Sequence, residues 1–155
     1  MDLLKLKSKT RLIGRREYVD FPELNVFGIE AKIDTGAYTS ALHCHDVKVK
    51  NLEGSPTLCF KLFDPTHPEY NEQEHRFQHF TIKTIKNSFG EAEERFVIRT
   101  IVSIGKKKIR CAISLTDRVN MRYPVLIGRK MIKNKFIIDV GKIHTGGVSC
   151  FGINT

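Results

Sequence analysis

The sequence predicts an all-β protein with at most one or two short helices. Apolar and polar residues alternate, as in half-buried strands, at 29–33, 47–50, 96–104 and 109–115. Turn-forming residues recur between these stretches, at 51–54, 64–65, 87–90 and 105. No window sustains a helical period for long. Many short strands joined by turns indicate a closed β-barrel or a sandwich.

Three of these stretches define the most specific predicted elements. Residues 29–33 form a strand that runs directly into Asp34. Residues 96–104 and 109–115 form a hairpin, because the glycine and lysines at 105–108 separate two alternating runs. This hairpin is the longest continuous sheet element that the sequence predicts.

The second half of the chain adds a short buried strand at 136–138 and one or two helical turns at 128–133. We expect one domain over 1–155, with a core at about 11–140. The small and polar residues 146–155 suggest a loose tail. Residues 64–90 begin with a proline-rich loop, and the sequence leaves open whether they cover a cleft.

Composition restricts the class of protein. The chain has 41% hydrophobic residues, and no apolar run approaches the roughly 20 residues needed to cross a bilayer. We therefore expect no membrane association. The four cysteines are scattered, which is typical of reduced thiols in a cytoplasmic protein. A net charge of +9 favours acidic partners, although it also serves solubility.

The segment Asp34-Thr35-Gly36-Ala37 carries the chemistry. A glycine after the strand allows a tight turn, and the threonine hydroxyl can bond to neighbouring backbone. The turn would hold the Asp34 carboxylate at the mouth of a cleft. Two such carboxylates close together share one proton, activate a water and protonate a peptide. The same three residues also occur in ordinary turns, so the motif alone is weak.

A second motif strengthens this interpretation. Residues 124–129 read Pro-Val-Leu-Ile-Gly-Arg, an apolar run followed by glycine just before the predicted helix. Together with Tyr123 and residues 30–37, 39–43 and 115–118, this segment resembles the retropepsin-like aspartic proteases labelled "ATP-dependent zinc protease", a family associated with the RimK glutamate ligase. The resemblance covers roughly residues 11–140.

The resemblance implies a retropepsin-like barrel or sandwich and an aspartic endopeptidase with Asp34, Thr35 and Gly36 at its centre. Because the chain has one Asp-Thr-Gly, the resemblance also implies a homodimer in which two copies of Asp34 meet. A monomer would need a partner acid from its own chain. The candidates are Glu30, Asp117 and Asp139.

The resemblance assigns further residues to substrate binding or to support of the site. They are Glu30, Lys32, Ala37, Ser40, His43, Arg118 and Arg129. Arginine forks bind carboxylates, so the two arginines suggest an acidic peptide substrate, including polyglutamylated protein tails. Alternatively they form structural ion pairs with Asp117, Asp139 or Glu17. Lys32 either tunes Asp34 or pairs with Glu30.

The zinc and ATP in the family label find no support in the residues. The chain lacks a G-x-x-x-x-G-K-[ST] phosphate loop and an H-E-x-x-H helix. We therefore expect no cofactor and no metal. His43 and His45 are the one local pair of ligands, and a third would have to come from Asp46 or from another histidine: His67, His75 or His79.

Two other functions remain open from the sequence. A nucleic-acid-binding barrel would use the basic clusters at 5–16, 106–110 and 129–135, but the turn at 106–108 has no aromatic residue beside it. A retropepsin-like fold without catalysis would act as a dimeric binding module.

Overall fold

The computed structural model describes residues 10–86, 89–117 and 122–149, and the statements below concern those residues. The strands are β1 (Arg11–Ile13), β2 (Arg16–Phe21), β3 (Val26–Ile33), β4 (Ser40–Leu52), β5 (Ser55–Leu62), β6 (Glu74–Phe77), β7 (Thr81–Lys86), β8 (Ala92–Ile104), β9 (Lys107–Thr116), β10 (Val125–Ile127), β11 (Phe136–Ile138) and β12 (Val148–Ser149). A 3₁₀ turn, η1 (Pro22–Leu24), and a short helix, α2 (Arg129–Ile132), complete the elements. The all-β prediction is confirmed.

Six strands close into an irregular ring. The sheet runs β10-β3-β2-β8-β9-β4, and β10 also pairs with β4 at the other end of this path. The step from β2 to β8 is a single residue pair, Asp20 with Ser103, so the ring is not a regular barrel. Because β10 lies parallel to β3 and antiparallel to β4, the sheet is mixed.

The ring surrounds the hydrophobic core, because its strands turn their apolar faces inward. The β8–β9 hairpin is an example. Ile98 and Val102 of β8 are buried, as are Ile109 and Ile113 of β9. The register pairs Ile98 with Ile113 and Val102 with Ile109, so both strands present their apolar face inward together. The predicted hairpin is therefore confirmed.

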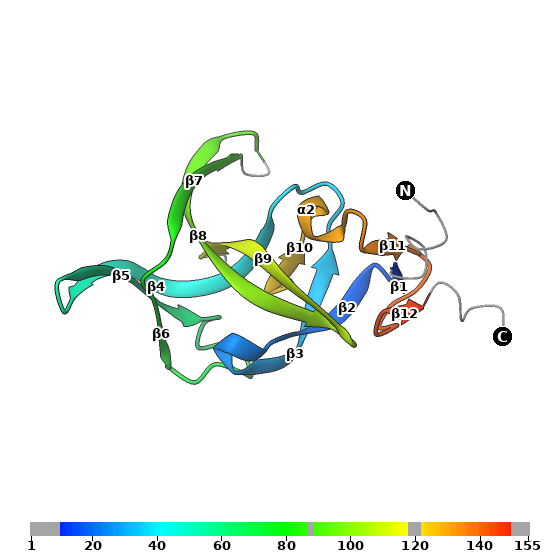
Figure 1. Ribbon diagram of the computed structural model, residues 1–155, viewed down its shortest axis with the longest axis horizontal. Coiled ribbons are helices and arrows are strands. Elements are labelled where there is room, and N and C mark those ends of the chain that lie inside the picture. The colour runs from blue at the N-terminus through cyan, green and yellow to red at the C-terminus, as the bar shows by residue number, and fades with distance from the viewer. Residues whose placement is uncertain (1–9, 87–88, 118–121, 150–155) are drawn as a thin grey trace.

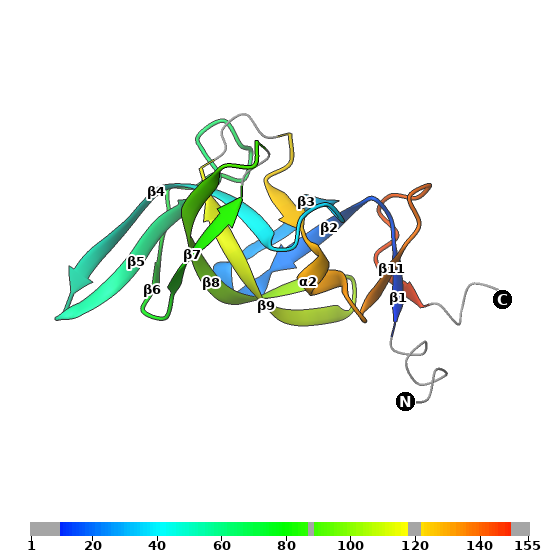
Figure 2. The same cartoon turned by 90° about the horizontal axis from the view of Figure 1, so that it is seen from above.

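Two long hairpins leave the ring. Figure 1 shows the β4–β5 hairpin, continued by β6, and the β7–β8 hairpin projecting as separate arms. Strands β1, β11 and β12 form a small sheet of their own at the opposite end of the molecule from the β4–β5 arm, as the view from above also shows (Figure 2).

A buried carboxylate attaches the small sheet to the ring. Glu17 of β2 is fully buried, and its oxygens accept bonds from the backbone N–H groups of Gly14 (2.7 Å), Thr145 (3.1 Å) and Gly146 (2.9 Å). The Thr145 hydroxyl also donates to Glu17 (2.8 Å). A buried carboxylate loses its hydrogen bonds to water, and these four donors take their place.

The C-terminal stretch differs from the expected loose tail. Residues 148–149 form β12 and pair antiparallel with β1, and Gly146 is bonded to Glu17. Residues 150–155 lie outside the described residues. No helix in the described part of the chain is long and apolar enough to span a bilayer.

Candidate functional site

The turn at Asp34 joins the end of β3 to β4 and is fixed by backbone hydrogen bonds. The Asp34 N–H donates to the carbonyl of Ile127 in β10 (2.8 Å), and the Ala37 N–H donates to the Asp34 carbonyl (3.2 Å). The Gly36 N–H donates to Asp34 Oδ1 (3.1 Å). A Cβ at position 36 would lie 3.3 Å from that same oxygen. The carboxylate is half-buried and reaches solvent.

The Ile127-Gly128 segment packs directly against this turn. The Gly128 N–H donates to the Ser40 hydroxyl (3.0 Å), and the Ser40 carbonyl accepts from the Ser114 hydroxyl (3.1 Å). A Cβ at Gly128 would lie 2.8 Å from the Tyr38 carbonyl oxygen. Glycine is therefore required here by close backbone approach.

Arg129 completes the connection between α2 and the turn. Its N–H donates to the Ala37 carbonyl (2.8 Å), and its guanidinium donates to the Thr35 carbonyl (2.9 Å). The guanidinium also lies 5.8 Å from the centre of the Tyr38 ring. Among the described residues Arg129 forms none of the structural ion pairs considered above. It holds the turn through neutral carbonyl groups.

His43 of β4 forms a buried polar pair with Asp64. Its Nε2 is 2.7 Å from Asp64 Oδ2, and its Nδ1 is 3.3 Å from the Thr116 carbonyl oxygen. Asp64 also accepts a bond from the Thr66 N–H (2.8 Å) and a very short one from the Thr66 hydroxyl. These bonds, the Thr66 hydroxyl first and His43 second, lower the pKa of Asp64 to about 2. The pair joins β4 to the loop after β5.

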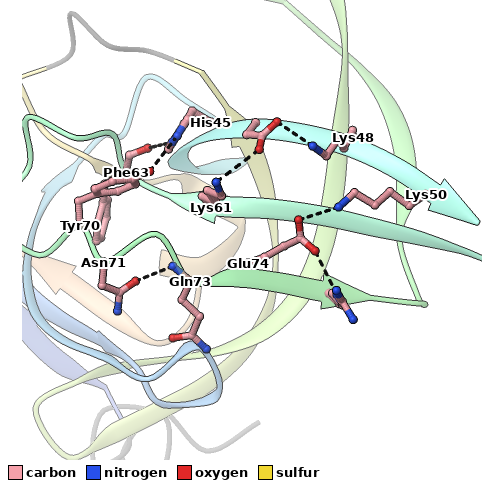
Figure 3. Close-up of polar contacts among 11 residues, drawn as sticks. His45, Lys48, Lys50, Lys61, Phe63, Tyr70, Asn71, Gln73 and Glu74 are labelled. Atoms are coloured by element: carbon pink, nitrogen blue, oxygen red, sulfur yellow. Dashed lines mark hydrogen bonds and ion pairs between the residues drawn. The ribbon is translucent and has the colours of Figure 1, made fainter. Parts of the chain in front are cut away.

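His45 has different partners from His43, as Figure 3 shows. Its Nδ1 lies 2.8 Å from the Phe63 carbonyl oxygen, and its Nε2 lies 3.3 Å from the Tyr70 hydroxyl. The described residues contain no group of three or more histidine, cysteine, aspartate or glutamate side chains placed to hold a metal ion. Neither histidine therefore belongs to an evident metal centre.

Glu30, an acid on the strand before Asp34, has other partners than Lys32. Glu30 lies 2.6 Å from His144 Nε2 and 3.9 Å from an Arg16 nitrogen. The suggested pairing of Lys32 with Glu30 is therefore wrong, because a histidine 114 residues later in the chain takes that carboxylate. Asp139, another candidate partner acid, accepts a bond from the Gly141 N–H (2.9 Å).

Lys32 instead lines a positively charged hollow beside the turn, which we call the basic pocket. Its volume is about 270 Å³, and its lining consists of Arg15, Arg16, Lys32, Ile33, Arg122 and Tyr123. Ile33 immediately precedes Asp34, so the hollow adjoins the turn. Arg15 donates to the Val140 carbonyl (3.1 Å), and Arg16 lies 3.5 Å from the Tyr123 hydroxyl.

The basic pocket contains functional candidates that the sequence did not reveal. Arg15, Arg16 and Arg122 belong to two segments far apart in the chain, and no motif connects them. The one available signal was that Arg122 directly precedes the matched segment 123–129. Arg118, which was expected in this role, lies outside the described residues.

The family of this chain follows from these features together with a family-model match. The model for "RimB-like: Retropepsin-like aspartic endopeptidase RimB" matches residues 12–146. The chain belongs to the RimB-like family. The match includes the Asp34 turn, the Ile127-Gly128 segment that packs on it, and the whole ring of strands.

Proteins with similar sequences carry a different name from that of the family. The chain is 34% identical over 132 residues to a protein from Shewanella pealeana and 34% identical over 133 residues to one from Desulfotalea psychrophila, each called "Probable alpha-L-glutamate ligase". The alignments cover 83% of this chain but 28% of each relative. The RimB-like chain therefore spans less than a third of the length of these relatives.

One solved structure has the same fold. It is a protein of unknown function from Legionella pneumophila, with a TM-score of 0.68 and 24% sequence identity. The alignment covers 88% of this chain and 98% of that one. At this level of identity the likeness shows the fold alone.

The Asp64–His43 pair makes stability depend on pH. Because the pKa of Asp64 in the folded protein is about 2, below its ordinary value of about 3.9, its contribution is present above pH 4 and is lost as the pH falls toward 2. Asp64→Asn should lower the free energy of unfolding by about 2 kcal/mol at pH 7. Urea denaturation should show this difference shrinking between pH 5 and pH 2.

Asp46→Asn is the matched control. Asp46 is exposed and forms ion pairs with Lys48 (3.1 Å) and Lys61 (3.7 Å), so solvent screens its charge. Its substitution should change stability little at pH 7. A loss for Asp64→Asn that stays constant down to pH 2 would contradict the assigned role of the carboxylate.

Proposed function

We propose that this chain is an aspartic endopeptidase that acts as a homodimer through paired Asp34 carboxylates. The observation that carries the proposal is the turn itself, which holds a half-buried, solvent-accessible carboxylate rigidly between two strands of a closed ring. An ordinary surface turn would not need Ile127, Gly128 and Arg129 bonded to it from another part of the chain. The family supports the same chemistry.

The proposed reaction uses one ionised and one protonated carboxyl group. The ionised Asp34 removes a proton from a water molecule, whose oxygen attacks the carbonyl carbon of the scissile peptide. The protonated Asp34 of the second chain donates its proton to the carbonyl oxygen. Collapse of the tetrahedral intermediate breaks the C–N bond. The leaving nitrogen takes the proton that the first Asp34 accepted from the water, and the second Asp34 takes back a proton from a hydroxyl of the intermediate. Two carboxyl groups brought side by side in this way share a single proton, because both cannot ionise next to each other.

A second chain is the simplest source of the other carboxyl group. Glu30 is engaged with His144, which makes it a poor partner within one chain. The turn lies at the surface, with Thr35, Gly36 and Tyr38 exposed around Asp34, so a two-fold axis could bring two copies together there. Asp139 and the exposed Asp117 are the remaining monomer candidates.

We infer that the substrate is acidic, with polyglutamylated protein tails as the leading candidate. The lining of the basic pocket has four cations and no acid, and among the described residues Lys32 and Arg122 form no ion pair, while Arg16 lies 3.9 Å from Glu30. A substrate carboxylate would neutralise them beside the scissile bond. That the longer relatives are called glutamate ligases fits a substrate made of glutamate.

The cellular setting of the proposal is the cytoplasm. Cys44, Cys59 and Cys111 are free and buried, and burial raises the pKa of Cys111 to about 11, which keeps it in the inert thiol form. Such thiols suit a reducing compartment.

Asp34→Asn tests the catalytic assignment. The amide keeps the size of the side chain but cannot act as the base, so cleavage of an acidic peptide should fall by at least about a hundredfold. Peptide hydrolysis followed by mass spectrometry measures the effect, with Asp46→Asn as a matched control that should retain activity. Unchanged cleavage by the Asp34 variant would remove the basis of the proposal, and no cleavage by the native protein would favour a binding module.

Lys32→Gln combined with Arg122→Gln tests the substrate class. Loss of two cations from the basic pocket should raise KM for a glutamate-rich peptide about tenfold while kcat changes little. Lys108→Gln, at an exposed position near the start of β9, is the control. The acidic preference would be wrong if KM for a neutral peptide rose by the same factor.

A further inference from the structure

A second and larger hollow lies on the outer face of the sheet formed by β7, β8 and β9. We call it the outer groove. Its volume is about 1070 Å³, and none of residues 34–37 lines it. Its charged lining residues are Glu23, Arg76, Lys83, Arg99, Arg110 and Lys130. It therefore contains five cations and a single acid, in addition to the separate basic pocket.

Strand register explains why the cations gather on this face. Arg99 of β8 lies directly opposite Ala112 of β9, and Arg110 lies opposite Ile101, two residues farther along β8. The side chains of Arg99 and Arg110 thus share the face opposite to the buried residues Ile98 and Ile109. Because Ala112 is small, the sheet is hollowed between the arginines.

Most of this charge is not neutralised within the chain. Glu23 binds Arg110 (3.3 Å) and also accepts a bond from the Ile101 N–H (3.0 Å). Arg76 pairs with Glu74 (3.1 Å), a contact drawn in Figure 3. The other three cations, Lys83, Arg99 and Lys130, form no ion pair among the described residues. All three side chains are exposed.

Two open strand edges border the outer groove. In the described pairing, β6 is bonded to β5 alone and β7 to β8 alone, so each keeps one edge without a partner strand. The connection at residues 78–80 joins these two strands and also lines the groove. An open edge offers backbone donors and acceptors to an extended peptide, which adds to the sheet as another strand.

The aromatic residues of the groove distinguish a peptide from a nucleic acid. Phe77 stacks on Phe60 with ring centres 5.7 Å apart, and Phe80 meets the edge of Phe96 at 5.9 Å. Both rings are half-buried against the core. Single-stranded nucleic acids bind by stacking bases on free aromatic faces, and these rings are already engaged. Their exposed edges add apolar contact area for a peptide.

We propose that the outer groove binds an extended acidic segment of a partner polypeptide, at a distance from the catalytic turn. The volume is at the upper end of the roughly 300–1,000 Å³ typical of binding sites, which suits a segment of several residues. Carboxylates of the segment would face Lys83, Arg99 and Lys130, and its backbone would pair with an open edge. This inference does not depend on catalysis by Asp34.

The test measures binding of fluorescein-labelled decaglutamate by fluorescence anisotropy in the Asp34→Asn background, which prevents cleavage. The double variant Lys83→Glu and Arg99→Glu should weaken binding about tenfold. The matched control, Lys106→Glu and Lys108→Glu, reverses the same number of charges at exposed positions in the β8–β9 turn and at the start of β9, and should remain within about twofold. Thermal melting checks that both proteins fold, and Lys83→Gln with Arg99→Gln replaces the first variant if it does not.

Three outcomes would overturn the proposal. Equal losses in both double variants would mean that only net charge matters. Tighter binding of a decathymidine oligonucleotide than of decaglutamate, lost in the same variant, would make the groove a nucleic-acid site. In NMR titrations, peptide-induced shifts confined to residues 32–36 would place the peptide in the basic pocket, whereas shifts at Val97, Arg99 and Arg110 would support the outer groove.

Discussion

The structure depends on the insertion of one three-residue strand, β10, between β3 and β4. Val125 is opposite Ala31 of β3 on one side and opposite Leu42 of β4 on the other. This double pairing closes the ring and brings Ile127 and Gly128 onto the Asp34 turn. The backbone bond from Asp34 to Ile127 and the bond from Gly128 to Ser40 follow directly. The position of the carboxylate is thus a property of the whole ring rather than of a local loop.

The folded ring also determines which basic side chains are left without an acidic partner in the chain. Three acids in the stretch from β2 to β3 are already engaged: Glu17 with backbone donors, Glu30 with His144, and Glu23 with Arg110. The excess of 26 basic over 17 acidic side chains therefore concentrates in hollows whose cations have few partners. One hollow adjoins the Asp34 turn and the other lies on the outer face of the sheet. A glutamate-rich chain could engage both without competing with the internal ion pairs.

The sequence predicted the elements whose burial differs between their two faces. Strands β3, β8 and β9 alternate clearly, and α2 follows an apolar run ending in glycine. The start of β4 was missed because residues 40–44 are all buried, between β9 and β10, so alternation disappears there. Strand β7 was missed for the opposite reason. It is almost wholly exposed, and no core contact imposes a pattern on it.

The sequence predicted only those site residues that belong to the matched segments. Asp34, Gly36, Ala37, Ser40 and Arg129 lie together as the matched segments implied, although their roles in catalysis stay predictions. The basic pocket and the pairing of Glu30 with His144 could not be read from the sequence, because each joins segments more than 80 residues apart. Such charge clusters form only when the chain folds, so no local residue spacing in the sequence indicates them.

The central claim is that Asp34 works as one half of a pair supplied by two chains. The most direct measurement is specific peptidase activity over a dilution series, compared with the monomer–dimer equilibrium from sedimentation at the same concentrations. The account predicts that specific activity falls in proportion to the dimer fraction as the protein dissociates. Constant specific activity in a solution of monomers would contradict it, because a single chain would then supply both acids.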